Sequence, residues 1–223
     1  MPSHTLLNTS VDTLANTPAG TLIILDFETT GLSPNMGDRA IEIGAVRLEN
    51  GVITERFQEL MNPGQRVSGF IESYTGISNA MLVDADPCEL VMQRFADFID
   101  GYNLIAHNAS FDKRFLDAEL ARIDRTYSGE FSCSLLLSRR IFQGAHSHSL
   151  GHLVDYANIP SDGGFHRALY DAEMTAKVWL AMLANIEARY GLFDIPFALI
   201  QKICKTPKKS VEKLLTSHLE QQR

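Results

Sequence analysis

The stretch Leu22-Ile23-Ile24-Leu25-Asp26-Phe27-Glu28-Thr29-Thr30-Gly31 decides how the rest of the sequence is interpreted. Residues 21–27 form a short apolar run that follows Gly20, which predicts a buried central strand. Residues two apart on a strand point to the same face, so we expect the carboxylates of Asp26 and Glu28 to project together. An isolated Asp-x-Glu pair can equally be a solvated strand end. Its meaning therefore depends on which other side chains the fold brings to it.

Two further extended stretches follow the first one, at residues 40–48 and 52–61. They are joined by Asn50-Gly51, and Asn-Gly between such runs is the strongest short signal for a β-hairpin because both residues tolerate positive φ. The domain is therefore expected to open with a three-stranded antiparallel meander.

The rest of the chain alternates between helical and extended spacing. Helices are expected at 87–99, 112–123, 150–157 and 168–190, and strands at 103–106 and 130–133. Ser149 is a natural N-cap for the third of these helices. Strands followed by an alternation of strands and helices predict an α/β fold, a mixed sheet with helices packed on its faces.

Composition excludes several classes of protein. The chain has 223 residues, a formal net charge of -7, a sequence pI near 5.5 and 45% hydrophobic residues. It is too apolar to be disordered. The net negative charge argues against a protein that coats nucleic acid by neutralising many phosphates over its whole surface. Any polyanionic partner must therefore be bound at a limited site.

The cysteines and the hydropathy pattern bear on location. Cys88, Cys133 and Cys204 lie far apart, so neither a disulfide framework nor a thiolate zinc site is expected, and a reducing, cytoplasmic location is predicted. No apolar run approaches the ~20 residues that a membrane helix needs, and the first residues carry no secretory pattern. No membrane partner is therefore expected.

Two more acids stand near expected helix starts. In His107-Asn108-Ala109-Ser110-Phe111-Asp112 the simple account is that Asn108 or Ser110 caps the helix while Asp112 complements its dipole. In His166-Arg167-Ala168-Leu169-Tyr170-Asp171 the histidine lies just outside the last long helix and Asp171 lies more than one turn inside it. Each motif alone is also compatible with ordinary surface residues.

Taken together, the acids indicate a chemistry. Asp26, Glu28, Asp112 and Asp171 supply the oxygen ligands that Mg²⁺ or Mn²⁺ prefers, and clustered carboxylates repel one another unless a cation lies between them. Two ions ~4 Å apart could activate a water and stabilise the leaving oxygen of an in-line phosphoryl displacement. His166 would take the proton from that water, since the ordinary pKa of imidazole is ~6.5. Hydrolysis of phosphodiesters is the chemistry that these residues favour.

In order and spacing, these motifs closely resemble those of the DEDDh 3'-to-5' exonuclease superfamily, which includes proofreading subunits of bacterial replicative polymerases. The matching stretches are 25–32, 107–112 and 166–172, with a weaker match at Tyr74-Thr75-Gly76-Ile77-Ser78. The resemblance implies an RNase H-like fold with a mixed five-stranded sheet and helices on both faces. It also implies two metal ions held by the four acids, with His166 as general base. The sister class has a tyrosine where this chain has Arg167, which favours the histidine class.

The resemblance further implies a substrate, the 3' end of single-stranded nucleic acid, with DNA somewhat favoured over RNA and with release of nucleoside 5'-monophosphates. Glu28 and Thr29 would lie near the terminal 3'-hydroxyl, and Leu32 would pack against the last bases. Phe27 and Phe70 are candidate stacking surfaces, although an aromatic residue on a strand is as often part of the core.

The sequence divides into an N-terminal arm at 1–20, an exonuclease domain at 21–190 and a basic, helical C-terminal extension at 191–223. From residue 195 onward six basic residues stand against two acidic ones, a local net charge of +4 that leaves -11 on the other 194 residues. Thr206-Pro207 predicts a break between two short helices, with Pro207 at the first helical position of the second. The extension is either a secondary nucleic-acid contact or a solvated helical face.

Other functions stay open at this point. One is a subunit that binds nucleic-acid ends or a polymerase without cutting, although the intact acids and His166 speak against a degenerate relative. Another is a phosphatase of small nucleotides that uses the same carboxylates. A zinc site at His146, His148 and His152 is a weaker possibility, because no cysteine or acid lies nearby in the sequence. A polymerase or homodimer partner cannot be deduced from these residues.

Overall fold

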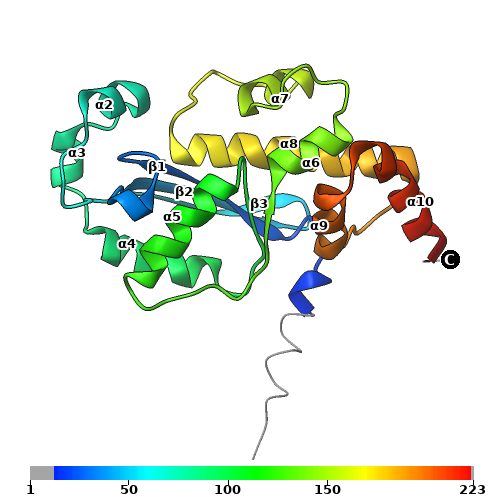
Figure 1. Cartoon of the computed structure of the whole chain (residues 1–223), viewed down its shortest axis with the longest axis horizontal. Coiled ribbons are helices and arrows are strands. Elements are labelled where there is room, and N and C mark those ends of the chain that lie inside the picture. Colours follow the sequence, from blue (N-terminus) through cyan, green and yellow to red (C-terminus); the bar gives the residue numbers. More distant parts are fainter. Residues whose placement is uncertain (1–12, 222–223) are drawn as a thin grey trace, which may run out of the picture.

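The computed structural model describes residues 13–221, which build one sheet flanked by helices (Figure 1). The five strands lie in the order β3-β2-β1-β4-β5. Their bounds are β1 (Leu22–Thr29), β2 (Ala40–Glu49), β3 (Val52–Leu60), β4 (Leu104–Ala106) and β5 (Phe131–Cys133). β1 is antiparallel to β2 and parallel to β4, and β4 is parallel to β5. The predicted mixed five-stranded sheet is confirmed.

The predicted hairpin joins β2 to β3. Its two turn residues, Asn50 and Gly51, have φ values of 52° and 79°, the left-handed conformation that this pair was expected to adopt. Because the turn fixes the register, the meander that carries the acidic motif is built entirely from local sequence.

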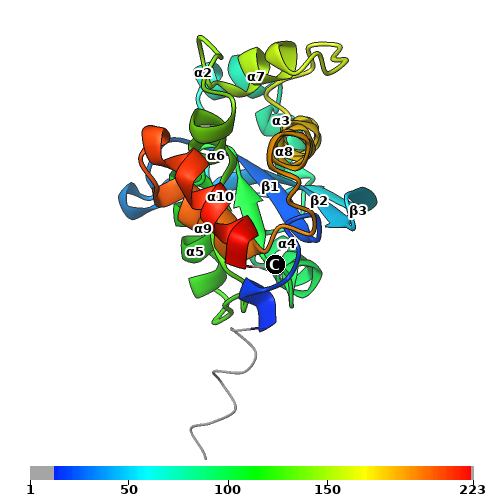
Figure 2. The ribbon, with the colours of Figure 1, turned by 90° about the vertical axis from the view of Figure 1, so that its right-hand side faces the viewer.

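Helices cover both faces of the sheet (Figure 2). Leu22 and Ile24 of β1 pack in one core with α6 (Ser134–Ile141), α7 (Leu150–Tyr156), α8 (Ala168–Tyr190) and α9 (Phe197–Lys205). Ile23 and Leu25 point the other way, into a second core with α4 (Cys88–Ile99) and α5 (Ser110–Ala121). The even-numbered residues of β1 therefore face α8, and Asp26 and Glu28 continue that row beyond the core.

Three helices were not among those expected from the sequence, namely α6, α2 (Gly69–Thr75) and α3 (Asn79–Val83). All three are short, so their apolar spacing covers too few turns to stand out. α2 and α3 begin at serines whose hydroxyls accept hydrogen bonds from backbone N–H groups one turn on, Ser68 from Ile71 and Ser78 from Met81. Capping, rather than amphipathic spacing, marks these helices in the sequence.

Of the two caps expected from the sequence, the one for α5 is wrong, and the one for α7 is right in position but lacks the side-chain hydrogen bond. α5 begins at Ser110 and its N-cap is Ala109, with no capping side chain, while Asn108 takes a left-handed φ of 64° in the preceding turn. Ser149 is the N-cap of α7, but its side chain makes no cap hydrogen bond and instead lies 2.6 Å from Nδ1 of His152. At the start of α5 the turn after β4 is closed by a backbone hydrogen bond, from the N–H of Phe111 to the carbonyl of Asn108 at 3.0 Å.

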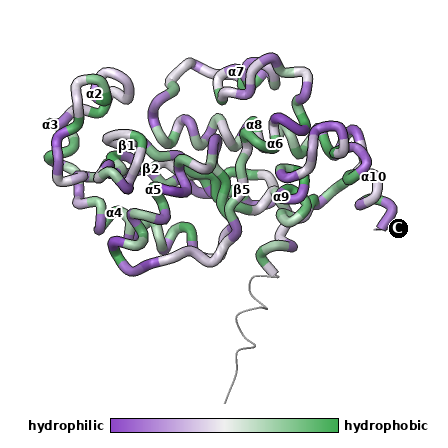
Figure 3. The backbone as a smooth tube through the Cα atoms, viewed as in Figure 1, coloured by the Kyte–Doolittle hydropathy of each residue, from purple (hydrophilic) through white to green (hydrophobic). Residues whose placement is uncertain are grey.

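The two ends of the described chain pack on the same core. Trp179 of α8 is fully buried and donates a hydrogen bond from Nε1 to the carbonyl of Ala19, and the N–H of Phe197 donates to the carbonyl of Thr17. α10 (Val211–Gln221) follows a 3-10 turn, η2 (Lys208–Ser210), whose N-cap is Pro207. The predicted break is present, with Pro207 one position before the turn. In Figure 3 the central strands are largely hydrophobic, whereas the connection from α9 to α10 is hydrophilic.

None of the helices within residues 13–221 has the length and apolar character needed to cross a lipid bilayer.

Candidate active site

A cavity of about 770 Å³ opens where β1 ends. Its walls come from residues 26–32, from α2, from the turn between β4 and α5, and from the segment that enters α8. The three sequence motifs, at residues 25–32, 107–112 and 166–172, therefore meet in one hollow. Each predicted site residue, from Asp26 and Phe27 to Thr29, Leu32, Asp112, His166 and Asp171, lines this cavity.

Three of the four predicted metal ligands form a compact group. One carboxylate oxygen each from Asp26, Glu28 and Asp171 lies within 4.8 Å of the others. Asp26 and Glu28 share the face of β1 that α8 covers, as their spacing predicts, and Asp171 comes from the first turn of α8. Glu28 and Asp171 are buried, with 9% and 8% of their surface exposed.

A glycine in β2 lets α8 come this close to the strand. Gly44 lies opposite Asp26 in the β1–β2 ladder, and a Cβ built on it would come within 2.0 Å of the backbone nitrogen of Leu169. No side chain fits in that space, so only glycine permits the approach. The first turn of α8, with Asp171 on it, is thereby placed directly over Asp26.

A fifth carboxylate fixes the entry into α8. Glu42 is fully buried in β2, opposite Glu28, and accepts hydrogen bonds from the backbone N–H of Ala168 at 3.0 Å and from Nη2 of Arg167 at 2.7 Å. A third donor, Nε2 of Gln58, lies 3.0 Å away. Glu42 acts as the cap that the start of α8 lacks within its own sequence.

Asp112 approaches from the opposite face of the sheet. It lies in the first turn of α5, is 2% exposed, and its Oδ1 accepts a hydrogen bond of 3.2 Å from the backbone N–H of Phe27. This bond ties α5 to β1 between Asp26 and Glu28. Asp112 is outside the group of three oxygens within 4.8 Å, but it borders the same cavity.

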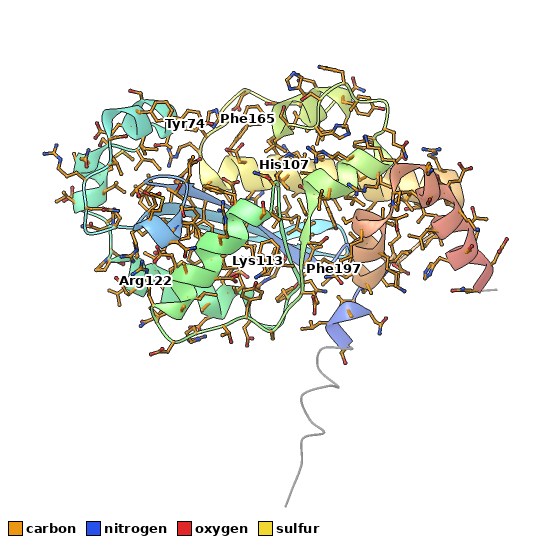
Figure 4. The ribbon with its side chains drawn as sticks, viewed as in Figure 1. Tyr74, His107, Lys113, Arg122, Phe165 and Phe197 are labelled. Carbon is orange, nitrogen blue, oxygen red and sulfur yellow. The ribbon has the colours of Figure 1, made fainter. Side chains whose placement is uncertain are left out.

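His166 stands at the mouth of the cavity in a constrained conformation. Its φ is 72°, a left-handed value that is rare for a residue with a side chain, and its N–H donates to Oδ2 of Asp171 at 2.8 Å. Its ring lies 4.1 Å from that of Tyr74, centroid to centroid. Figure 4 shows Tyr74 reaching from α2 toward the loop that precedes α8, where Phe165 is labelled. Backbone strain of this kind is typical of functional sites.

Burial and mutual repulsion shape the electrostatics of the cluster. The pKa of Asp26 is raised well above its usual range by burial, then by the charges of Asp112 and Asp171. Burial, followed by Asp171 and Glu42, raises the pKa of Glu28 to about 8. Burial likewise raises the pKa of Asp112 and of Asp171, against hydrogen bonds from backbone N–H groups that lower both. The site therefore concentrates more negative charge than protein groups alone balance.

This arrangement fits a divalent cation. Hard cations take carboxylate oxygens, and the three clustered oxygens converge from two elements on one point. A cation would relieve the repulsion that raises the pKa values of these acids. Within residues 13–221, the group is also the one set of His, Cys, Asp and Glu side chains with ligand spacing. His146, His148 and His152 form no such group, so the zinc site considered from the sequence is not supported.

The rim of the cavity is apolar and aromatic. Leu32 is 77% exposed and Phe70 is 73% exposed, and the ring of Phe70 stacks on that of Tyr74 at 5.8 Å. Phe27 differs from this rim, because its side chain is only 4% exposed and packs edge-on against Phe95 in the core. The expectation that the ring of Phe27 offers a stacking surface is not supported by this burial.

Two side chains next to the acidic cluster, those of Thr29 and His107, form hydrogen bonds that stabilise the structure around it. Thr29 is 7% exposed, and its hydroxyl donates a hydrogen bond of 2.6 Å to the carbonyl of Gly31, which shapes the turn after β1. His107 lies 3.0 Å from the carbonyl of His148 through Nε2 and 2.8 Å from the hydroxyl of Ser134 through Nδ1. Burial lowers its pKa to about 4, so the ring stays neutral, and it braces the wall of the cavity that it lines. Figure 4 labels His107 between α5 and α6.

Comparison with known proteins identifies the family. A model of the exonuclease family matches residues 23–179. The chain belongs to the DEDDh exonuclease superfamily. This exonuclease domain is 32% identical over 176 residues to the DNA polymerase III subunit epsilon of Aquifex aeolicus (strain VF5), covering 78% of the chain and 86% of that protein. It is 38% identical over 165 residues to the 3'-5' exonuclease DinG of Bacillus subtilis (strain 168), covering 74% of the chain but 18% of DinG.

A solved structure agrees with this membership. Exonuclease X in complex with 5' overhanging duplex DNA aligns with a TM-score of 0.61 and 30% identity, covering 81% of the exonuclease chain described here and 99% of that chain. The likeness confirms the RNase H-like fold. The chain spans less than a fifth of the length of DinG and of some other curated relatives that it matches.

Sequence reasoning missed three residues of this site. Glu42 is the one acid in the apolar stretch 40–46, and a lone acid on a buried strand needs partners. Gly44 interrupts the same strand, which marks a close approach of another backbone. Tyr74 lay inside a recognised motif, but nothing in the sequence showed that its ring meets His166.

Proposed function

We propose that the protein is a metal-dependent 3'-to-5' exonuclease that hydrolyses the last phosphodiester of single-stranded nucleic acid and releases nucleoside 5'-monophosphates. The observation that carries the proposal is the convergence of Asp26, Glu28 and Asp171 within 4.8 Å, beside Asp112 and His166 in one open cavity. Membership of the DEDDh superfamily supports the same reaction.

In this proposal Asp26, Glu28, Asp112 and Asp171 hold two divalent ions, Mg²⁺ or Mn²⁺. Such ions, when bound, would lower the pKa of an attacking water and stabilise the charge on the leaving oxygen. The hydrogen bond from Phe27 to Asp112 keeps one oxygen of that carboxylate turned toward β1. In this proposal the other oxygen of Asp112 is the one that contacts a metal ion.

His166 is the general base of the proposal. Its imidazole would accept a proton from the water as the water oxygen bonds to phosphorus, and the bond from phosphorus to the 3'-oxygen of the preceding nucleotide would break. The hydrogen bond from the N–H of His166 to Asp171 fixes the backbone at the edge of the cavity. The ring packs on Tyr74, which keeps it facing that edge.

The apolar rim would hold the terminal nucleotides. Bases at a single-stranded end expose their faces, and stacking on aromatic or apolar side chains is largely independent of base identity. Leu32, Phe70 and Tyr74 offer such surface, while Glu28 and Thr29 lie where β1 ends, near the place of the terminal 3'-hydroxyl. We assign Phe27 a positioning part through its N–H instead of its ring.

DNA is the favoured polymer, a cytoplasmic location is proposed, and a polymerase is a candidate partner. The preference for DNA is supported by a matched structure that contains DNA. The polymerase partner is supported by a matched protein that is a subunit of DNA polymerase III. The cytoplasmic location is supported by the three cysteines, which are all unpaired thiols in the structure.

Purified protein incubated with 5'-labelled single-stranded DNA or RNA and Mg²⁺ or Mn²⁺ tests the proposal. A ladder of products that shorten stepwise from the 3' end, faster on DNA, is expected, and His166→Ala should slow it at least about 100-fold. Release of inorganic phosphate from a mononucleotide without shortening of the oligomer would instead indicate a phosphatase. An unshortened oligomer with every metal would contradict the proposal.

A further inference from the structure

A second groove, of about 310 Å³, runs beside the cavity along the outer edge of β5. Its walls come from the start of α5, through Ser110 and Lys113, and from α9, through Lys205. The first turn of α5 belongs to both hollows, because Asn108 and Phe111 line the catalytic cavity while Ser110 lines the groove. The groove therefore borders the same turn and helix start as the candidate active site.

Basic residues lie on the elements that flank this groove, α6, α9 and the turn after α9. Leu136 of α6 lines it, and one helical turn further on, α6 carries Arg139 and Arg140. Arg140 donates from Nε to the carbonyl of Thr206, which ties α6 to the end of α9 and to the two lysines that follow, Lys208 and Lys209. We call this set the basic face, and it consists of Arg139, Arg140, Lys205, Lys208 and Lys209.

The five residues of the basic face form no ion pairs in the described part of the chain. Across residues 13–221, no carboxylate lies within ion-pairing distance of any of its five members. Four of the five are exposed, and Arg140 is partly exposed. The acid that lines the groove, Glu130, accepts a hydrogen bond of 3.2 Å from Gln201. Elsewhere on the surface arginines are commonly paired, as in Arg94 with Asp86 and Arg125 with Asp97.

Arg114 contacts one residue from each hollow, Phe111 of the catalytic cavity and Ser110 of the groove. It is exposed, its guanidinium lies 6.0 Å from the centroid of the Phe111 ring, and its Nε donates to the carbonyl of Ser110. A chain of phosphates leaving the cavity past Phe111 would meet Arg114 first and Lys205 next.

We propose that the basic face and groove bind the sugar-phosphate backbone of the strand whose 3' end occupies the cavity, several nucleotides upstream of the cleaved bond. This inference rests on the proposed function and assigns the C-terminal extension a part in it. The chain as a whole has a net charge of -7, but residues 195–221 carry five lysines and only two glutamates. This positively charged segment would attract a polyanion. The contacts are to phosphate, so they would not depend on base sequence.

Length dependence tests the proposal. The wild-type enzyme should show a lower KM for a 20-nucleotide DNA than for a 3-nucleotide DNA that reaches only the cavity. Lys205→Glu/Lys208→Glu should raise KM for the longer DNA by about tenfold and leave the shorter one within about twofold. Lys177→Glu/Arg189→Glu, two exposed changes on α8 with the same charge difference, should leave both substrates unchanged.

A binding measurement separates this from catalysis. Fluorescence anisotropy of the labelled 20-nucleotide DNA in EDTA, repeated from low to high salt, should give a slope of log affinity against log salt that is smaller by about 1.4 for Lys205→Gln/Lys208→Gln, since each phosphate contact of a single strand contributes about 0.7. Unchanged KM and salt slope in a folded variant would overturn the proposal. If even the wild type shortens neither DNA, the proposed exonuclease function fails. The salt dependence of DNA affinity still tests whether the basic face binds phosphates, because that measurement needs no cleavage.

Discussion

Gly44 lies opposite Asp26 in the β1–β2 ladder, and the backbone of Leu169 occupies the place where a Cβ of residue 44 would be. The close approach of strand and helix is what brings Asp171 to Asp26 and Glu28. An alanine at position 44 would push the start of α8 away, and a displacement of about 1 Å at a catalytic group can reduce the rate by about 100-fold.

Gly44→Ala is therefore expected to lower exonuclease activity at least about 100-fold and to destabilise the fold by about 1–3 kcal/mol through overpacking. Gly69→Ala is the matched control, because a Cβ there meets nothing within 4 Å and the residue begins α2. Activity assays and urea unfolding of both variants check this. Near-normal activity of a folded Gly44→Ala protein would contradict the assigned role.

The pair formed by Glu42 and Arg167 should behave as a coupled unit. Arg167→Ala leaves the fully buried carboxylate of Glu42 without its main cation, at a cost of up to about 3 kcal/mol, reduced because the arginine is partly exposed. Adding Glu42→Gln to Arg167→Ala removes the stranded charge and should recover part of that loss. A double-mutant cycle from urea unfolding measures the coupling. Strict additivity would show that the two residues act independently.

Binding of Mn²⁺ should strengthen as pH rises from 6 to 8.5. The pKa of Glu28 is raised to about 8 by burial and by neighbouring acids, so protons must leave the cluster before a cation binds. In the metal-free protein the same shift means that stability falls as pH rises from the ordinary carboxylate range toward 8. Thermal-shift titrations with Mn²⁺ at both pH values measure this. Asp171→Asn should abolish the metal-induced shift, and a shift that is independent of pH would contradict the assignment.

His107 should make the fold sensitive to acid in the opposite sense. Burial lowers its pKa in the folded protein to about 4, whereas the unfolded chain takes up this proton near pH 6.5. The unfolded state binds more protons in that window, so the stability contributed by the neutral ring is lost as pH falls from 6.5 toward 4, about 2 kcal/mol of it by pH 5. Urea unfolding of the wild type and of His107→Gln at pH 7.5 and pH 5 isolates the effect. An equal difference between the two proteins at both pH values would exclude it.

The elements that could be predicted from the sequence are those determined by short, contiguous stretches of residues. The apolar run before Asp26 and the Asn50-Gly51 turn each specify their own geometry, so the meander and the shared face of Asp26 and Glu28 followed from the residues themselves. α8 was also predictable, because an amphipathic pattern over 23 residues has few alternatives.

What could not be predicted depends on contacts between distant segments. The approach of α8 to Gly44, the cap that Glu42 gives to Ala168 and the contact of Tyr74 with His166 each join residues that are far apart in sequence. Short helices such as α2 and α6 were missed because tertiary packing, more than their own spacing, stabilises them. The burial of Phe27 likewise follows from Phe95, more than sixty residues away.

The identity of the released product tests the central claim most directly. Single-stranded DNA is digested in water enriched in ¹⁸O with Mg²⁺ or Mn²⁺, and the products are analysed by mass spectrometry. We predict nucleoside 5'-monophosphates, released from the 3' end, each with one ¹⁸O on phosphorus, and none with Asp26→Asn. Nucleoside 3'-phosphates, or 5'-monophosphates without the label, would contradict attack by water on the terminal phosphodiester.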